Sequence, residues 1–526
     1  MKYDVKDLEN MDKNELIAKF LSLHESFKLE LQAEKIKSEK KDEKIKRLET
    51  HIAWLRKQLF GKKSEKIIAT NNGSKQLPLF EDEYIPEDTP PEKTVTVKEY
   101  EKKCRKKATE VSGRLQYDDS VEVIEEVIEP EEIKGLSEDK YEVIGEEVTE
   151  VVAQVRGYYR IKRYIRKKYK IKDTKQIVKA ALPTDVTVLE RSIADVSLLS
   201  GLVIDKFRYH LPLYRIHQRL LSSGIKISRG TLTNFVHRTA ELLEPVYRAL
   251  QSNILQSKVV QMDETPVKAG NENHKMKNGY YWVVHGDGGT SFLFSPTRSG
   301  DNIKKILKDF QGIVVSDGYK PYETFAINTW QVKRAQCWAH VRRKFFEALE
   351  TEPELSNPVI EMIRELYCIE GQAKSFEEKK RIRSVQSSLI VDRIFEYLRK
   401  VSLESDLVKS SLFYKAVSYA FSNERALRVF LDEPSVPLDN NTVERANRYN
   451  AVGRKNYMFH WTEVGAQRAA ILYSLVISCI SNGIDPYEYL IDVLKRIQIH
   501  PAKDVDLLTP ALWKNNFSSE AFKTKA

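Results

Sequence analysis

Three acidic residues, far apart in the chain, have the residue types and settings of divalent-metal ligands. Asp263 closes the strand-like run 259–263, and Asp317 closes a second run, 313–317. Glu444 lies at the start of a helix-like segment. Aspartates at strand ends and a glutamate on a later helix suit a two-metal phosphoryl-transfer site, in which the ions hold the attacking and leaving oxygens of a phosphodiester. Hard carboxylate oxygens favour Mg²⁺ as the ion.

Each acid also has a structural explanation. Strand-terminal aspartates often form turns or cap helices, and Glu444 is spaced to pair with Arg448 one helical turn later. Two further acids are alternatives. Glu264 should point to the opposite face of its strand, and Asp287 lies in a Gly-Asp-Gly-Gly turn, where aspartate is favoured in any case.

Basic residues gather near these acids, where a DNA phosphate would supply the counter-charge. The expected phosphate contacts are Arg342, Arg343, Lys344, Arg445, Arg448, Arg454 and Lys455. His340 is a candidate general base or orienting residue, although a histidine in a helix is more often structural. Cys337 and His340 are spaced to bind a soft metal, but the sequence shows no partner pair for them.

The composition narrows the class of protein. A chain of 526 residues predicts several domains, and a net charge of +10 favours a polyanionic partner over a merely soluble basic protein. The four cysteines are scattered, so neither a disulfide framework nor a zinc finger is expected. The first residues lack the apolar core of a signal peptide, and the apolar stretch 469–480 is too short to span a bilayer. We therefore expect no membrane insertion.

The elements before the first acid suggest self-association and DNA contact. Residues 12–66 read as one helix with apolar a and d positions, which predicts a coiled coil; a solvated helix folding back on its own protein is the alternative. The β-rich stretch 119–175 contains a run, 158–169, that interleaves tyrosines with bases. This run suits phosphate contact with base stacking, or else forms a ribbon with a solvated basic face. Its expected DNA contacts are Arg160, Arg163 and Lys167.

Two helices predict a helix-turn-helix. Residues 213–221 and 231–243 are separated by Gly224, and Ser228 is a good N-cap for the second helix. Arg229 at its start is a further expected DNA contact. An ordinary helical hairpin without a DNA role has the same pattern.

The rest of the chain predicts a mixed sheet in an α/β domain. Residues 257–345 begin with a hairpin and continue with strands linked by helices. The resulting fold class is multidomain α/β. Its predicted parts are a coiled-coil helix (1–68), a linker (69–118), a small β-rich unit (119–180), a helix-turn-helix region (181–250), the first part of a catalytic core (251–349), a helical insertion (350–435), the glutamate helix of the core (436–464) and a C-terminal helical segment (465–526).

Several motifs, in this order, together carry a resemblance to a known family. They are LFGKKSEK (59–66), HLPLYR (210–215), DETP (263–266), DGY (317–319), CWAHVRRKF (337–345), DNNTVER (439–445) and GRKN (453–456). The chain resembles transposases of the bacterial insertion-sequence 66 family along nearly its whole length.

The resemblance implies a ribonuclease H-like catalytic domain with a DDE triad of Asp263, Asp317 and Glu444. It also implies two Mg²⁺ ions, for which Mn²⁺ can substitute: Asp263 would bridge both, with Asp317 and Glu444 completing the site. Such enzymes bind the terminal inverted repeats of their element, cleave a strand and join the freed 3′-hydroxyl to target DNA. The coiled coil would then form a homodimer or larger assembly, small accessory proteins of the element would assist, and the protein would work in the bacterial cytoplasm at the nucleoid.

One departure from the family pattern affects the β-rich unit. Relatives commonly carry a four-cysteine zinc finger there, but Ile171 and Thr174 stand where the second cysteine pair would fall. No zinc is therefore predicted. Two other functions stay open: a catalytically inert DNA-binding remnant, and a structure-selective nuclease of the same fold that cuts without joining.

Overall fold

The fold is taken from a computed structural model. It describes residues 115–518, except 118, 120, 135–139, 156, 173–174, 183–187, 271–274 and 405–406, and isolated residues between 17 and 49. The chain divides into two compact units, Met1–Arg114 and Leu115–Ala526. The described residues between 17 and 49 are helical, as predicted for this segment. Coiled-coil pairing and the finer domain boundaries stay predictions, and most of the predicted linker lies outside the described residues.

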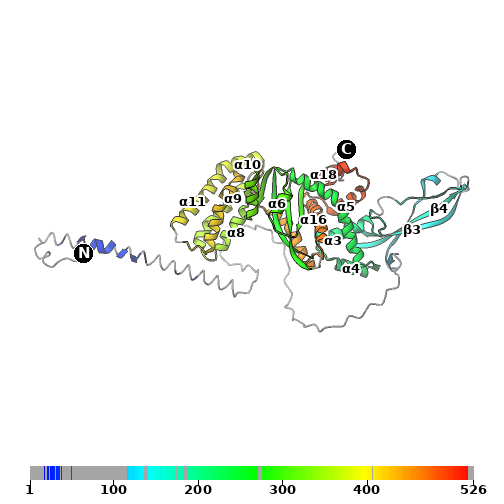
Figure 1. The fold of residues 1–526 in the computed structure, drawn as a ribbon, viewed down its shortest axis with the longest axis horizontal. Helices are drawn as coiled ribbons and strands as arrows, with labels where there is room; N and C mark the ends of the chain where they lie inside the picture. Colours follow the sequence, from blue (N-terminus) through cyan, green and yellow to red (C-terminus); the bar gives the residue numbers. More distant parts are fainter. Residues whose placement is uncertain are drawn as a thin grey trace, which may run out of the picture. The chain divides into compact units, whose positions relative to one another are not determined.

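A long hairpin dominates the β-rich unit (Figure 1). Its strands β3 and β4 pair antiparallel, and Gly157, with φ of +99°, lies in the turn between them. Strand β2 runs parallel to β4, and β5 pairs antiparallel with it. The strands are β2 (Val123–Val127), β3 (Tyr141–Val155), β4 (Tyr158–Ile171) and β5 (Ile177–Lys179). The prediction of a β-rich stretch here is confirmed.

Three helices follow the β-rich unit: α3 (Val196–Phe207), α4 (Leu213–Ser222) and α5 (Arg229–Leu255). Gly224, with φ of +78°, follows α4, and the Ser228 hydroxyl caps α5 by accepting from the Thr231 amide. A short strand, β6 (Ile225–Lys226), occupies the turn and pairs with β1 (Gln116–Tyr117). The DNA role of this pair of helices stays a prediction.

The second of these helices is longer than predicted. It continues through Pro245 to Leu255, whereas the sequence predicted its end at 243. Proline removes one hydrogen bond and disfavours a helix interior. Here Val246, Leu250 and Ile254 continue the buried stripe of the helix into the main core, and this burial outweighs the local preference.

A five-stranded mixed sheet forms the centre of the second unit. Its strands are β7 (Val259–Gly270), β8 (Met276–Gly286), β9 (Gly289–Ser295), β10 (Gly312–Ser316) and β11 (Val332–Gln336). Their order in the sheet is β11-β10-β7-β8-β9. The pairs β7–β8 and β8–β9 are antiparallel, whereas β10 is parallel to both β7 and β11. Strands linked by helices therefore follow a hairpin, as predicted.

Two hydrophobic cores lie on the two faces of this sheet. Along β10, Val314 belongs to the main core, whereas Ile313 and Val315 belong to the core of the helical insertion. This alternation is the two-residue period of a strand buried on both faces. The connecting helices α6 (Asp301–Ile306) and α7 (Lys320–Asn328) join the later strands.

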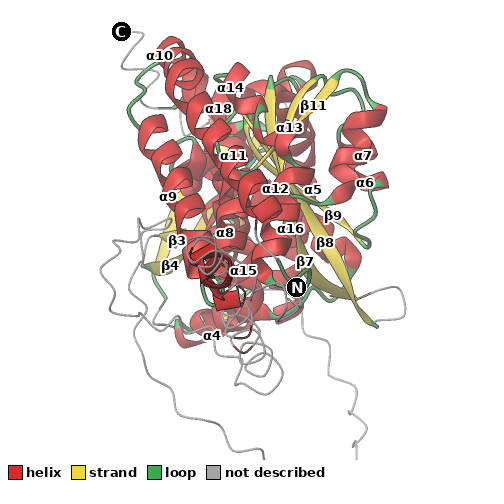
Figure 2. Cartoon of the chain, turned by 90° about the vertical axis from the view of Figure 1, so that its left-hand side faces the viewer, coloured by secondary structure: helices red, strands yellow, loops and turns green. Residues whose placement is uncertain are grey.

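The predicted helical insertion is confirmed, and its helices stand beside the sheet in Figure 2. It follows α8 (Trp338–Ala348) and consists of α9 (Pro353–Glu370), α10 (Phe376–Ile382), a π-helical turn (Arg383–Ser387), α11 (Ser388–Glu404), α12 (Leu412–Ser422), α13 (Glu424–Leu427) and α14 (Val429–Asp432). Helix α15 (Asn441–Tyr457) then returns the chain to the sheet, where it contacts β7 and β8.

A single buried arginine ties the insertion to the segment that leads into α15. Arg383 is fully buried and forms a two-point ion pair with Glu370 of α9. Its guanidinium also donates to the carbonyl oxygens of Phe430, Glu433 and Val436, at 2.7, 2.9 and 2.9 Å. The insertion and the segment before α15 therefore share one polar anchor.

Helix α16 (Glu463–Ser481) packs against β9 and α5 in the main core. The Ser474 hydroxyl accepts from the Phe292 amide at 2.8 Å, and the Ser478 hydroxyl accepts from the Thr290 amide and donates to the Thr290 carbonyl, at 2.8 and 3.0 Å. Among the described helices, α16 is the one long and apolar enough to span a bilayer, and 67% of its most apolar window is buried. Such burial is typical of a core helix.

The chain then turns as the sequence predicted. Asn482 caps α16, Gly483 has φ of +66°, and the Asp485 carboxylate accepts from the Tyr487 amide to start α17 (Pro486–Arg496). A 3-10 segment (Ala502–Leu508) and α18 (Pro510–Phe517) complete the described unit.

Candidate functional site

The two aspartates lie level with each other on neighbouring parallel strands. The register pairs Val315 of β10 with Gln261 of β7, and each stands two residues before its aspartate. Asp317 directly follows β10, as predicted. Asp263, however, lies inside β7 rather than at its end. The strand continues because β8 pairs with it as far as Gly270, whereas pairing with β10 stops before Asp263.

Helix α15 brings its polar face to the first aspartate. The Asn447 side-chain amide donates to the Asp263 carboxylate at 2.6 Å. The Asn440 side-chain amide likewise donates to the Met262 carbonyl at 2.7 Å. Glu444, one turn before Asn447, lies in the first turn of α15. The helix that carries the third acid is therefore bonded to the strand that carries the first.

Burial and crowded negative charge perturb Asp263. Burial is the largest cause that raises its pKa, to about 7, and the charges of Glu264 and Asp317 add to the rise. The hydrogen bond from Asn447 opposes these effects, and Glu444 contributes a smaller increase. Several carboxylates that repel one another around a buried oxygen form a set that a divalent cation would neutralise.

Glu444 faces helix α8 rather than open solvent. Its Oε1 lies 3.8 Å from His340 Nδ1, and its Oε2 lies 3.5 Å from the Arg343 guanidinium. Burial lowers the pKa of His340, although the charge of Glu444 opposes that change. The imidazole and the guanidinium both lie beside the carboxylate. The role of His340 as a general base or orienting residue stays a prediction.

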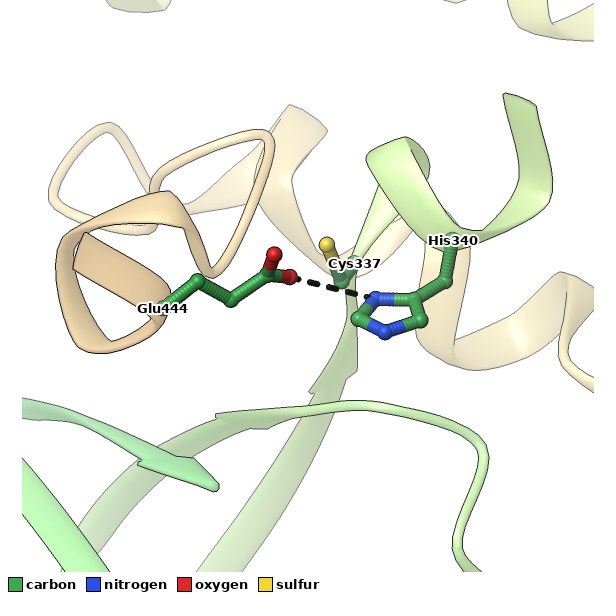
Figure 3. Close-up of side chains that lie close together, drawn as sticks. All are labelled: Cys337, His340 and Glu444. Atoms are coloured by element: carbon green, nitrogen blue, oxygen red, sulfur yellow. Dashed lines mark ion pairs between the residues drawn. The ribbon is translucent and has the colours of Figure 1, made fainter. Parts of the chain in front are cut away.

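The side chain of Cys337 lies close to those of His340 and Glu444 (Figure 3). The ligand atoms of Cys337, His340 and Glu444 all lie within 4.8 Å of one another. Cys337 is buried at the N-cap of α8, where its Sγ accepts from the Asn440 amide at 3.2 Å. The spacing of Cys337 and His340 in the sequence showed no third ligand beside them. In the fold Glu444, about a hundred residues downstream, is brought close to both by α15.

The alternative acids have other partners. Glu264 accepts from Arg298 and from the Tyr322 hydroxyl, at 2.8 and 2.9 Å, so it points away from Asn447 as predicted for the opposite strand face. Asp287 lies in the turn between β8 and β9, where its amide donates to the Ser257 hydroxyl at 2.9 Å. The sequence analysis assigned no role to Asn447 or Arg298, because their partners are distant in the chain.

The predicted phosphate contacts near the acidic motifs lie on helices α8 and α15. Arg342 and Lys344 lie over the rings of Phe346 and Tyr419, at 5.8 and 4.7 Å, and Arg343 contacts Glu444. Arg454 donates to the Thr265 hydroxyl and to the Pro266 carbonyl. The exposed members of the set on α15 are Arg445, Arg448 and Lys455.

The basic run of β4 is largely neutralised within the protein. Arg160 pairs with Glu122 at 3.1 Å, and Arg163 pairs with Glu125 and Glu150 at 2.5 and 3.0 Å. Lys167 lies opposite Glu146 in the register of the hairpin.

The stacking interpretation of this run is wrong for three of its four tyrosines. Tyr159, Tyr164 and Tyr169 are buried, because they pack into the hydrophobic clusters of the hairpin and its neighbours; Tyr158 is exposed. Arg229 is exposed at the start of α5, over the Tyr214 ring at 5.8 Å.

Comparison with protein families gives three matches along the chain. Residues 191–468 match the family described as "Transposase IS66 family". Residues 474–511 match "IS66 C-terminal element", and residues 47–124 match "Transposase C of IS166 homeodomain". The first match includes Asp263, Asp317 and Glu444.

Three curated relatives come from Sinorhizobium fredii (strain NBRC 101917 / NGR234). "Uncharacterized protein y4jD" is 31% identical over 392 residues, which are 70% of this chain and 76% of the relative. "Uncharacterized protein y4hP" is 29% identical over 505 residues, covering 89% and 88%. "Uncharacterized protein y4qI" is 30% identical over 426 residues, covering 76% and 77%.

Proposed function

Because the chain belongs to the IS66 family of transposases, we propose that it binds the ends of a mobile DNA element and catalyses metal-dependent strand cleavage and strand transfer. The observation that carries this proposal is the level placement of Asp263 and Asp317 on adjacent parallel strands. The bond from Asn447 to Asp263 supports it, because it ties the helix of Glu444 to the same strand.

Two Mg²⁺ ions would be held by the acidic set, and Mn²⁺ would substitute. Asp263, Asp317 and Glu444 would supply the carboxylate ligands. The raised pKa of Asp263, caused by burial and by the neighbouring acidic charges, favours a cation here. When bound, such ions lower the pKa of an attacking water and stabilise the charge on the attacking and leaving oxygens.

In this proposal, other side chains of the protein orient the carboxylate ligands and neutralise the DNA phosphates. Asn447 fixes one oxygen of Asp263, so that the other oxygen is directed to a ligand. His340 and Arg343 hold Glu444 from the side of α8. The DNA backbone would be held by phosphate contacts from Arg342, Lys344, Arg445, Arg448, Arg454 and Lys455.

Three further parts of the proposal concern the architecture and the assembly. The mixed sheet, with three antiparallel strands followed by two parallel ones, supports a ribonuclease H-like catalytic domain. The match of residues 47–124 to a transposase homeodomain supports DNA contact by the N-terminal part. Pairing of the predicted coiled coil would bring two element ends together, and accessory proteins of the element would assist.

The test uses the DNA that flanks the gene. Labelled end fragments are incubated with the full chain and Mg²⁺, beside Asp263→Asn and a matched control, Asp287→Asn, which alters an acid of the neighbouring turn. We expect defined cleavage and joined products from the parent and the control, and DNA binding without products from Asp263→Asn. Cleavage by Asp263→Asn would refute the assignment.

The products also separate the other two functions. Cut ends without joined products would indicate a nuclease of the same fold. Binding of the end fragments by the parent chain without any cleavage would indicate an inert DNA-binding remnant.

A further inference from the structure

We propose that Cys337, His340 and Glu444 form a second metal site, for a thiophilic divalent ion such as Zn²⁺, which shares Glu444 with the magnesium site. The shared carboxylate gives the second site a consequence that rests on the proposed function: an ion bound there withdraws Glu444 from Mg²⁺ and inhibits DNA cleavage.

The ligand set selects the ion. A cysteine sulfur, an imidazole nitrogen and a carboxylate oxygen are the three protein ligands of zinc, and a thiolate favours zinc strongly over magnesium. Tetrahedral zinc with ordinary bond lengths holds its ligand atoms roughly 3.3–3.8 Å apart. The three atoms here lie within 4.8 Å of one another, so side-chain shifts of about 1 Å would complete the geometry. A water would supply the fourth ligand.

Two of the ligand atoms lack hydrogen-bond partners, which is an independent sign that a cation fits between them. His340 Nδ1 and Glu444 Oε1 are both buried from solvent and have no hydrogen-bond partner, although they lie only 3.8 Å apart. A buried polar atom left without a partner costs about 1–3 kcal/mol. One cation bound between these atoms and the sulfur would satisfy both.

Backbone hydrogen bonds fix the relative positions of the two segments that carry the three ligands. Cys337 and His340 are three residues apart at the start of α8, so their side chains lie on one face of the helix. The Trp338 amide donates to the Leu438 carbonyl at 2.9 Å, and the Asn440 amide donates to Cys337 Sγ. These bonds join the start of α8 to the segment before α15, and therefore fix the distance between the cysteine and the helix that carries Glu444.

The two proposed metal sites lie on different sides of Glu444 and compete for its carboxylate. Helix α8 supplies the soft ligands, whereas β7 and the end of β10 supply the aspartates. Among the described residues, Cys337, His340 and Glu444 are the one group of three such side chains whose ligand atoms come this close together. In this arrangement Glu444 is therefore turned toward the soft ligands.

The first experiment measures binding without DNA. The full chain, freed of metal with a chelator, is titrated with Co²⁺, whose absorption reports a bound thiolate. We expect a thiolate-to-cobalt charge-transfer band at one ion per chain, removed by Zn²⁺ but not by Mg²⁺. Cys337→Ser should lose the band and weaken Co²⁺ affinity by more than about 100-fold, because even changes outside the ligand set cost 10–100-fold.

Two matched variants keep this result interpretable. Cys368→Ser removes an exposed cysteine of α9, outside the cluster, and should leave the band intact. His340→Gln keeps the thiol but should weaken binding, which separates loss of a ligand from misfolding. Absence of the band from the parent chain, or the same band in Cys337→Ser, would overturn the proposal.

The second experiment tests the inhibition. Zn²⁺ is titrated into the cleavage reaction at fixed Mg²⁺, and the rate of each variant is compared with its own rate without Zn²⁺. We expect micromolar Zn²⁺ to inhibit the parent and added Mg²⁺ to relieve the inhibition, with Cys337→Ser at least tenfold less sensitive. Equal sensitivity of the two would refute the link between the sites. A chain that cleaves no DNA would refute the proposed function, yet the cobalt result would still decide the metal site.

Discussion

The buried Arg383 anchor gives the sharpest test of how the insertion supports the site. We predict that Arg383→Met destabilises the insertion strongly, because methionine keeps the apolar volume but removes every donor. The change leaves Glu370 without its two-point partner and three carbonyl oxygens without a donor. Lys379, at 2.9 Å from Glu370, compensates in part.

The expected loss of stability follows from the burial of the Arg383–Glu370 ion pair. Removing one partner of a buried ion pair costs about 3–5 kcal/mol, because the other charge stays buried and unpaired. The matched control is Arg399→Met, whose arginine pairs with Glu424 at 2.9 Å while about half of its side chain is exposed. Exposed pairs contribute only about 0–1 kcal/mol. The two variants remove the same chemical group, so the difference between them reports the buried ion pair together with its three carbonyl contacts.

Hydrogen exchange is the suitable assay, because a chain of several domains does not unfold in one two-state transition. We expect peptides from α9 to α14 to lose about 3–5 kcal/mol of protection in Arg383→Met and less than about 1 kcal/mol in the control. Peptides of α16 serve as an internal reference. A loss in Arg383→Met that matches the control would refute the reasoning, since the buried network would then contribute nothing beyond a surface pair.

Three further predictions concern the site, the pH dependence and the DNA contacts. Asn447→Leu should lower cleavage by roughly 10–100-fold with Mg²⁺ affinity reduced in parallel, because it removes the bond that orients Asp263; unchanged kinetics would contradict that role. Burial lowers the pKa of His460 to about 3, so the unfolded chain takes up the proton first and stability is lost as pH falls below about 6.5. Between pH 7 and 5 the parent should therefore lose about 2 kcal/mol more than His460→Gln, measured as hydrogen-exchange protection of peptides from β8, whose Tyr281 hydroxyl bonds the His460 ring; equal losses would contradict a neutral buried imidazole. Lys455→Ala should reduce the salt dependence of DNA binding by about one counterion, whereas Arg163→Ala, already paired with two glutamates, should change it little.

Local signals in the sequence predicted much of the fold. The Ser228 cap, the Asp485-Pro486 start and the glycine turn between β8 and β9 each act through neighbouring backbone, so residue types alone were enough. The extension of β7 past Asp263 was missed, because it depends on pairing with β8. The continuation of α5 through Pro245 depends on core packing in the same way.

The candidate site was predicted as a set of residues but not as a geometry. Motif order supplied Asp263, Asp317 and Glu444, yet nothing in the sequence indicated that Glu444 would face His340 and Cys337. The basic run of β4 was misinterpreted for a related reason. A pattern of alternating tyrosines and bases does not tell which face is covered, and the carboxylates that neutralise the bases come from β2, from the residue before it and from β3.

The Ser474 and Ser478 hydroxyls of α16 affect how two copies of this protein could associate. Strand β9 is the outermost strand of the sheet, and its outward amides at Thr290 and Phe292 would otherwise be open to pair with a strand from another chain. Ser478 and Ser474 occupy those amides from a helix instead of a strand. At these two positions the edge is therefore closed to a strand from a second copy. Until α16 has docked, the same edge is open, so the newly made chain is most exposed to aggregation just before its last helices fold.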